Sequence, residues 1–368
     1  MNLERMIVLV LFSFSAYGAD LYEYNRPVRA LGMGNVYLTF VKDTDAPTLN
    51  PAALGFVSGI SLEIINLGVG LNGYESLSSY RQTNSVSNAS DYDQFFGKKV
   101  WVGGNGRLAL TLPNFGVSVY DDAKVSLILR NTAFPNMDMT FFNDYGLVVA
   151  GALPIAPLTS LGIAFKRISR WGGYQTVGLS TIATGNSAAL QNEFENKGVG
   201  YGSDIALMTK LPGLLSPSFA VVWQDVGSTA FTKTTGNDAP PRIKDNLQAG
   251  VGVNLDLPGI DLSAGVEYRH INDLGVQIGK KLHTGVELSL PLIELRAGSS
   301  QGYSTFGAGF SFLFLNFDAA MFKTEAGEYP GQSPEDRLLL SLSIDLSVDA
   351  NFNFYSKDGK KRSLKQRR

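Results

Sequence analysis

The sequence predicts an all-β fold, a transmembrane antiparallel β-barrel of about 14 strands. The end of the chain gives the clearest observation, because from Leu340 to Phe354 every even position is apolar and every odd position is polar. Successive side chains of a β-strand point to opposite faces, so this segment predicts one strand with an apolar and a polar face. The segment is far longer than the usual soluble strand of about 5 to 6 residues, whereas a tilted strand crosses a bilayer with about 9 to 11.

The same alternation recurs in the second half of the chain, which is the second observation. It covers residues 247–256, 262–269, 286–290, 293–297 and 317–321. The charged residues in these segments, such as Glu267 and Arg269, stand opposite the apolar ones. A transmembrane barrel separates a lipid-facing wall from a polar interior in this way.

The composition argues against a helical membrane protein, which is the third observation. Hydrophobic residues make up 44% of the chain. Beyond the first 18 residues, however, no uninterrupted apolar run approaches the roughly 18 residues that a spanning helix needs. A membrane protein without such helices satisfies its backbone hydrogen bonds in a closed barrel. The 40 glycines fit strongly twisted strands and tight turns.

The first residues predict a signal peptide at 1–18. Arg5 precedes a short apolar run at 7–14, and the small residues Ala16 and Gly18 stand three and one positions before a cut ahead of Ala19. The run is too short to span a membrane. The chain has no cysteine, so disulfides contribute nothing to its stability. The expected location is the outer membrane of a Gram-negative cell, as a multi-pass barrel.

The spacing of the patterns predicts fourteen strands. They are expected at residues 58–71, 107–120, 123–132, 140–153, 158–168, 199–211, 216–226, 244–256, 260–269, 282–290, 292–299, 303–312, 313–322 and 338–355. Short turns alternate with long connections, at 169–198, 227–243, 270–281 and 323–337. Bacterial barrels place short turns in the periplasm, so both ends of the chain are expected there.

The second predicted strand, 107–120, changes the parity of its apolar residues at Pro113 and Asn114. A turn or a kink explains such a change. Bacterial barrels have an even number of strands, which favours a kink at Pro113.

Two stretches in the connections have helical signals. Ser90 precedes Phe95 and Phe96 and the pattern stops at Gly97. In the second stretch, Leu190 and Phe194 are four residues apart. Two interpretations remain open: these apolar residues anchor the loops to the barrel rim, or they form an apolar mouth for a hydrophobic ligand.

The most specific residue pattern lies before the first strand. It comprises Arg29–Val36 (RALGMGNV), then Asp43 and Asp45, then Leu49–Gly55 (LNPAALG). Near the other end stand Glu267–Arg269 (EYR), Leu295–Gly298 (LRAG) and Tyr329–Arg337 (YPGQSPEDR). In these segments the chain resembles the FadL-like superfamily of outer-membrane barrels, which includes long-chain fatty-acid transporters. It resembles most the branch that contains the shuttle porin of type IX secretion.

The resemblance implies that residues 19–57 form an internal plug, or hatch, inside a barrel at 58–355. Asn50, Pro51 and Ala52 match the plug motif of the fatty-acid transporters. Together with Gly32, Gly34 and the kink at Pro113, they are the predicted ligand path.

The motif also has a purely structural interpretation. The residue before a proline avoids helical geometry and alanine is small, so Asn50–Ala52 equally fits a tight corner between the plug and the first strand. Gly32 and Gly34 permit close backbone packing without any ligand.

The end of the chain departs from the family pattern. These barrels commonly end on an aromatic residue of the last strand, whereas here a basic tail follows at 356–368. The tail carries seven Lys or Arg and one Asp from Lys357 to Arg368. Like charges with few apolar groups predict a disordered periplasmic extension.

No enzymatic centre, cofactor or metal site is predicted. The chain has only two histidines, His270 and His283, so a metal site would consist mostly of carboxylates. His283 shares the polar parity of Glu287 and is expected in the interior. The only basic block is the short tail, which excludes a broad nucleic-acid role.

The predicted function is passage of small hydrophobic molecules, fatty-acid-like or aromatic, across the outer membrane by binding and diffusion. The expected partners are outer-membrane lipid and a small hydrophobic ligand. The alternative is a non-transporting surface or secretion-accessory barrel that scaffolds a periplasmic or secreted protein partner. A continuous apolar path past Asn50–Ala52 favours transport, and an interior packed with ion pairs favours the scaffold.

Overall fold

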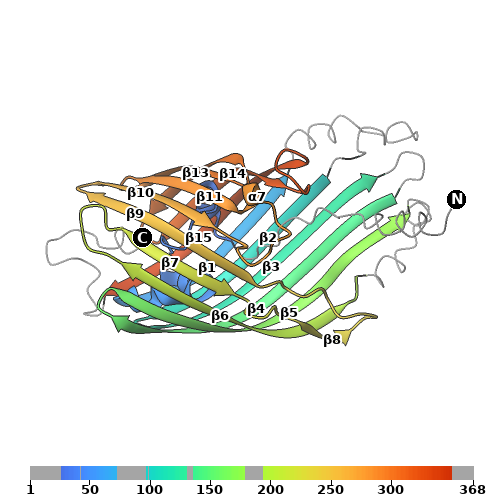
Figure 1. Ribbon diagram of the computed structural model, residues 1–368, viewed down its shortest axis with the longest axis horizontal. Helices are drawn as coiled ribbons and strands as arrows, with labels where there is room; N and C mark the ends of the chain where they lie inside the picture. Colours follow the sequence, from blue (N-terminus) through green and yellow to red (C-terminus); the bar gives the residue numbers. More distant parts are fainter. Residues whose placement is uncertain are drawn as a thin grey trace.

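The chain forms a closed antiparallel β-barrel with a segment of the chain inside it (Figure 1). The computed structural model describes residues 26–41, 43–72, 97, 99–130, 136–178 and 194–349. The predicted signal peptide and basic tail lie outside these residues. The strands are β1 Gly59–Asn72, β2 Lys99–Leu112, β3 Phe115–Arg130, β4 Asn136–Ala156, β5 Thr159–Gly178, β6 Lys197–Lys210, β7 Ser218–Gln224, β8 Phe231–Thr235, β9 Asn246–Leu257, β10 Ile260–Tyr268, β11 Leu282–Ser289, β12 Ile293–Ser300, β13 Tyr303–Phe312, β14 Leu315–Glu325 and β15 Pro334–Asp349. Among the described residues, no helix has the length and apolarity to cross a membrane.

The wall has fourteen strand positions, as predicted, because β7 and β8 share one of them. β7 pairs with the second half of β6, and β8 pairs with its first four residues. Between them the backbone breaks at Asp225, Gly227 and Ser228, which have φ angles of 51°, 77° and 68°. Pairing of β1 with β15 closes the barrel.

The predicted alternation of the last strand is confirmed in β15. Leu340 is 48% exposed on the outside of the barrel, whereas Ser343 is buried inside. Other strands follow the same rule, and their outward side chains include Leu62, Val69, Val149, Ile163, Phe219, Val251, Leu262 and Phe306. This apolar outer surface faces lipid in a membrane barrel.

The predicted kink at Pro113 is wrong. Strands β2 and β3 pair continuously from Leu112 and Phe115 outward, so Pro113 and Asn114 form a hairpin turn. Asn114 has a φ of 65°, a left-handed conformation that asparagine tolerates. The strand count is unchanged because residues 115–120 of the second predicted strand and residues 123–130 of the third are both part of β3.

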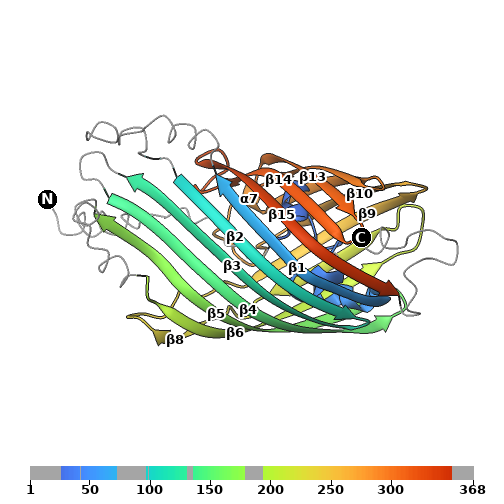
Figure 2. The same ribbon diagram turned by 180° about the vertical axis from the view of Figure 1, so that it is seen from behind.

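The loop predicted at 169–198 is wrong over residues 169–178, which continue β5. Strands β4 and β5 have 21 and 20 residues, against 8 to 12 for β9 to β14. The long strands project beyond the short ones at one end of the barrel (Figure 2). Beyond the lipid both faces of a strand meet water, so the alternation that identifies a membrane strand is lost there.

Residues 26–57, called the inner segment below, lie inside the barrel. Their helices are α2 Val28–Gly32, η1 Asp43–Asp45, α3 Ala46–Leu49 and η2 Pro51–Phe56. The helix α2 contacts β12 to β15, and η2 contacts β3 to β6 on another part of the wall. Nearly all described residues of the inner segment are buried. The sequence pattern before the first strand therefore belongs to chain that fills the interior.

A row of glycines lets the inner segment press directly onto the wall. Gly252, Gly265, Gly285 and Gly298 are direct cross-strand partners on β9 to β12. A Cβ atom added at Gly285 would overlap the backbone carbonyl of Met33. Glycine is required here because the inner segment lies where side chains would otherwise be.

Replacing a glycine of this row is expected to loosen the inner segment. Gly285→Ala should lower the temperature at which the folded barrel unfolds in detergent, because the added methyl group overlaps backbone that cannot rotate away. Gly104→Ala on β2 is the matched control, since its Cβ would meet only one atom, at 3.6 Å. Equal unfolding temperatures of the two variants on gels of unboiled samples would contradict this packing.

Candidate functional site

The interior of the barrel has an apolar arc and a charged arc. The charged arc consists of buried charged side chains from β1, β2 and β10 to β12: Glu63, Arg107, Glu267, Glu287 and Arg296. The apolar arc consists of inward side chains from β3 to β8 and the connection after β8: Tyr120, Val148, Ala150, Ala164, Ile168, Ala206, Met208, Ala220, Val222, Phe231 and Ile243. All of them are buried, and they form one cluster with the inner segment. The interior is therefore not uniformly polar.

The second half of the inner segment covers the apolar arc. Leu49, Ala52 and Leu54 are at most 2% exposed and belong to the same cluster. The backbone of Pro51 and Ala52 lies directly on β5 at Gly162, where a Cβ would overlap it. Apolar surfaces meet in this contact, and Gln224 of β7 and the Asn114 N–H add hydrogen bonds to the carbonyls of Thr48, Leu49 and Leu54.

The predicted motif Asn50–Ala52 lies at the centre of this contact. The Asn50 side chain caps η2 by accepting a hydrogen bond from Ala52 N at 3.1 Å. Its amide nitrogen donates to the Leu38 carbonyl at 2.8 Å. The structure places the motif as a fully buried corner against the wall, and its role in a ligand path stays a prediction.

The charged arc holds the first half of the inner segment through Glu287 on β11. Arg29 donates two hydrogen bonds to this carboxylate, at 2.8 and 2.6 Å, and Arg296 donates a third at 2.6 Å. Arg296 in turn donates to Asp318 at 2.6 Å and pairs with Glu294. Paired guanidinium groups offset the cost of burying the carboxylate.

Glu267 and Arg107 bind the inner segment at two further points. Glu267 accepts hydrogen bonds from the backbone N–H groups of Tyr37 and Leu38, each at 2.5 Å. Asp45 forms an ion pair with Arg107 of β2, which also donates to Glu63. The inner segment is thus fixed to the charged arc at three separate points.

The predicted glycines Gly32 and Gly34 lie on the same side. Thr305 of β13 donates to the Gly32 carbonyl at 3.1 Å and accepts from Gly34 N at 2.8 Å. His283 is in the interior, as predicted, with Nδ1 at 3.1 Å from the Gly34 carbonyl oxygen. These glycines serve close packing on the wall.

A second charged group lies where β7 breaks. Lys166 of β5 is fully buried between Asp204 and Asp225, at 2.6 and 2.9 Å. Further from the short turns, Arg170 of β5 pairs with Asp144 of β4. Its guanidinium carbon also lies 4.9 Å from the ring centres of Phe142 and Phe231. Charged and aromatic groups therefore meet at the end of the apolar arc that lies away from the short turns.

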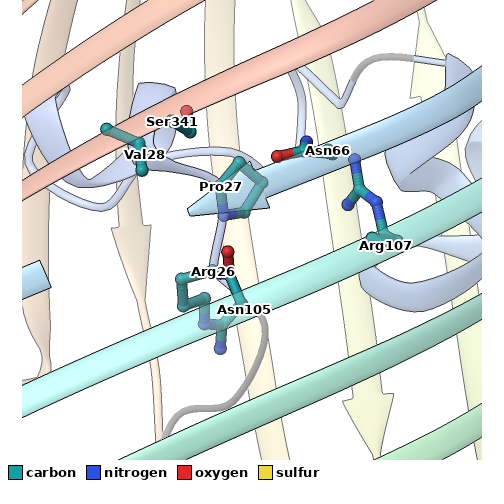
Figure 3. A pocket seen from close by; sticks show the side chains of 7 residues that line it. All are labelled: Arg26, Pro27, Val28, Asn66, Asn105, Arg107 and Ser341. Carbon is teal, nitrogen blue, oxygen red and sulfur yellow. The ribbon is translucent and has the colours of Figure 1, made fainter. Parts of the chain in front are cut away.

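The pocket between the start of the inner segment and β1, β2 and β15 has room for about one water molecule (Figure 3). Its volume is about 10 Å³. It is lined by Arg26, Pro27, Val28, Asn66, Asn105, Arg107 and Ser341. In this conformation the pocket does not admit a hydrophobic ligand.

Of the predicted ligand mouth, Phe95, Phe96 and Leu190 lie outside the described residues. Phe194 packs edge-on against Phe141, with ring centres 6.1 Å apart, and its carbonyl accepts from the Trp171 indole. Phe141 and Trp171 stand next to the inward residues Phe142 of β4 and Arg170 of β5, so they point outward. Phe194 therefore lies on the outer side of the wall.

The sequence analysis missed the apolar arc, although the sequence contains a signal for it. In β4, β6 and β7 apolar residues stand at both parities, as in Val148–Ala150, Ala206–Met208 and Ala220–Val222. A strand that is apolar on both faces in a membrane barrel faces lipid on one side and an apolar interior on the other.

Solved structures share this architecture. CymD, a monoaromatic hydrocarbon channel, matches with a TM-score of 0.51 at 13% identity, over 92% of this chain and 99% of that chain. The deltaS2S3 mutant of the monoaromatic hydrocarbon channel TodX matches with a TM-score of 0.50 at 11% identity, over 88% and 99% of the two chains. The chain has the FadL-like barrel fold. No protein-family model and no curated protein matches the chain.

Removal of the Glu287 charge is expected to destabilise the FadL-like barrel strongly. Glu287→Gln leaves the buried Arg29 and Arg296 without this carboxylate, which typically costs about 3 to 5 kcal/mol. Asp336→Asn is the control, because its pair with Lys323 is exposed and is worth at most about 1 kcal/mol. Urea unfolding in liposomes measures both, and similar losses would contradict the role of Glu287.

The stability of the inner segment is expected to depend on pH through Asp43. Burial raises the pKa of this carboxyl to about 6, although a hydrogen bond from Ser61 at 3.2 Å opposes the shift. The folded state therefore binds the proton more tightly than the unfolded state, and stability is lost as pH rises from about 4 to about 6. Asp43→Asn should lose less stability over this window than the wild type in thermal unfolding. An identical pH profile for both would contradict the assignment.

Proposed function

We propose that the protein allows small hydrophobic molecules, fatty-acid-like or aromatic, to cross the outer membrane by binding and diffusion. The apolar arc is the observation that carries this proposal. Along β4 it comprises Val148, Ala150 and the partly buried Ala152, about 13 Å of strand next to the turns, and the ion pair of Asp144 with Arg170 separates it from Phe142. This apolar wall offers contact to a hydrophobic molecule over the part of the route next to the turns.

The route is proposed to open when residues 46–57 move away from the wall. This part of the inner segment contacts β3 to β6 through apolar surfaces, which are not directional. The hydrogen bonds that would have to break include those from Gln224 Nε2 to the Thr48 and Leu49 carbonyls, at 3.5 and 3.4 Å, and from Asn114 N to the Leu54 carbonyl, at 3.1 Å. The first half is held by Arg29 and by the backbone bonds to Glu267. A local shift of the second half therefore exposes the apolar arc without releasing the whole inner segment.

The comparison supports the class of ligand. CymD and TodX are monoaromatic hydrocarbon channels, and their whole length aligns with this barrel. Arg170, between the rings of Phe142 and Phe231, would mark the upper end of the route. Aromatic faces at this position suit an aromatic ligand.

A non-transporting scaffold is the second candidate, and the buried ion pairs of the interior favour it. Buried ion pairs at Glu287, Arg107 and Lys166 fix the interior in one arrangement. An interior of this kind suits a rigid barrel that presents its loops to a protein partner.

A disulfide between the inner segment and β5 is expected to block uptake. A Cβ built on Gly55 lies 2.6 Å from Ser160 Cβ, so a small outward shift gives the roughly 3.5 to 4.5 Å of a disulfide. The chain has no other cysteine, so Gly55→Cys/Ser160→Cys gives one defined bond. Oxidised cells should take up labelled toluene and palmitate at the level of a deletion strain, and a reductant should restore uptake.

The two single cysteine variants are the controls and should transport under both conditions. Uptake by the oxidised double variant that equals the reduced level and exceeds the deletion strain would exclude a route along the apolar arc. Uptake equal to the deletion strain for every version, wild type included, would favour the scaffold.

A further inference from the structure

The six short turns at one end of the barrel are apolar. They comprise residues 112–115 (LPNF), 153–158 (LPIAPL), 211–217 (LPGLLSP), 257–260 (LPGI), 290–293 (LPLI) and 312–315 (FLFL). None of them contains a charged residue, and five begin with Leu-Pro. These residues are called the turn rim below. Ordinary turns are rich in polar residues because they face water.

The side chains of the turn rim are exposed. Leu214 is 78% exposed and Leu153 is 63% exposed. The other exposed apolar residues of the rim are Phe115, Ile155, Leu158, Leu211, Leu215, Leu257, Ile260, Leu292, Ile293, Phe312, Leu313, Phe314 and Leu315. A continuous apolar ring of this size marks contact with a membrane or a partner.

The backbone of the turn rim is adapted to an environment without water. The prolines remove N–H groups that would otherwise need an acceptor. Several turn carbonyls accept from the backbone of the next hairpin: Asn114 from Ala152, Leu158 from Lys210, Leu215 from Asn254, Leu292 from Ser311 and Phe314 from Asp345, at 2.8 to 2.9 Å. Turns in water need no such bonds, whereas in hydrocarbon backbone groups must be satisfied within the protein.

The short strands are too short to span the apolar band of a bilayer without the turns. Strands β11 and β12 have 8 residues each. At a tilt of about 40° such a strand rises only about 20 Å, against an apolar band of about 25 Å in transmembrane barrels. The adjoining turns at 290–293 and 312–315 supply the missing apolar height.

We propose that the turn rim is immersed in the bilayer and that its partner is the phospholipid acyl chains of the adjoining leaflet, the inner one if the turns are periplasmic. The rim is continuous with the lipid-facing surface, for example from Phe312 to Phe310 and from Leu153 to Val149. It is also apolar on all six turns. A membrane contacts the whole circumference, whereas a docked protein would cover only some of the turns.

Single cysteines in this cysteine-free chain test the proposal. Leu214→Cys, Leu292→Cys and Leu313→Cys carry a nitroxide label on three turns, in protein reconstituted into phosphatidylethanolamine–phosphatidylglycerol vesicles. Val251→Cys on the outer wall is the lipid reference, and Ser333→Cys, in the connection at the opposite end, is the water reference. The accessibility to oxygen relative to a water-soluble nickel chelate should be severalfold higher on the rim than at Ser333→Cys and close to that at Val251→Cys.

A rim ratio equal to that of Ser333→Cys would overturn the proposal and leave a protein partner as the cover of the rim. Hydroxyl-radical footprinting of the wild type in the same vesicles tests it without any variant. Leu214, Leu215 and Phe314 should be protected, whereas Tyr329, which is 52% exposed in a connection at the opposite end, should be oxidised. Oxidation of the rim residues to the extent seen at Tyr329 would likewise overturn it.

Discussion

Closure of the wall is the constraint on which the rest of this structure depends. In hydrocarbon no water is present to satisfy backbone N–H and C=O groups, so a sheet can cross a membrane only if it has no free edge. The pairing of β1 with β15 meets this requirement. Once the wall is closed, the period-two alternation divides every strand into lipid-facing and interior residues. It also leaves an interior that the protein must fill, and the inner segment fills it.

The interior is filled by two kinds of contact with different physical properties. Ion pairs and hydrogen bonds at Glu287 and Glu267 fix the first half of the inner segment in direction and distance, and Arg107 holds Asp45 near the start of the second half. The apolar arc contacts the second half through apolar surfaces, whose stabilisation depends on area, and hydrogen bonds from Gln224 and Asn114 add to this contact. In the proposed passage, the first half stays anchored while the second half moves away from the apolar arc.

The barrel has a long side and a short side, and the sequence reflects the difference. Strands β4 and β5 extend well past the short strands, and the residues of β5 from Ser169 on lose the apolar alternation. Strands β11 and β12 are shorter than the apolar band requires, and apolar turns continue their outer surface. In the wall, backbone groups are paired within the protein. The hydrogen bonds that the turn carbonyls accept from neighbouring strands pair backbone groups in the same way at the end of the barrel.

The sequence by itself determined the fold class, the number of wall positions and the faces of strands such as β15, because lipid on one side and a polar interior on the other leave a periodic pattern. It did not determine the turn at Pro113 or the length of β5. A change of parity fits both a turn and a kink, and strands outside the lipid have no pattern. The candidate site was predicted only in part: Asn50, Gly32 and Gly34 stood out, but the apolar arc and the partners of Arg29 did not. Only the tertiary structure decided these, because they depend on which strands the inner segment meets once the barrel has closed around it.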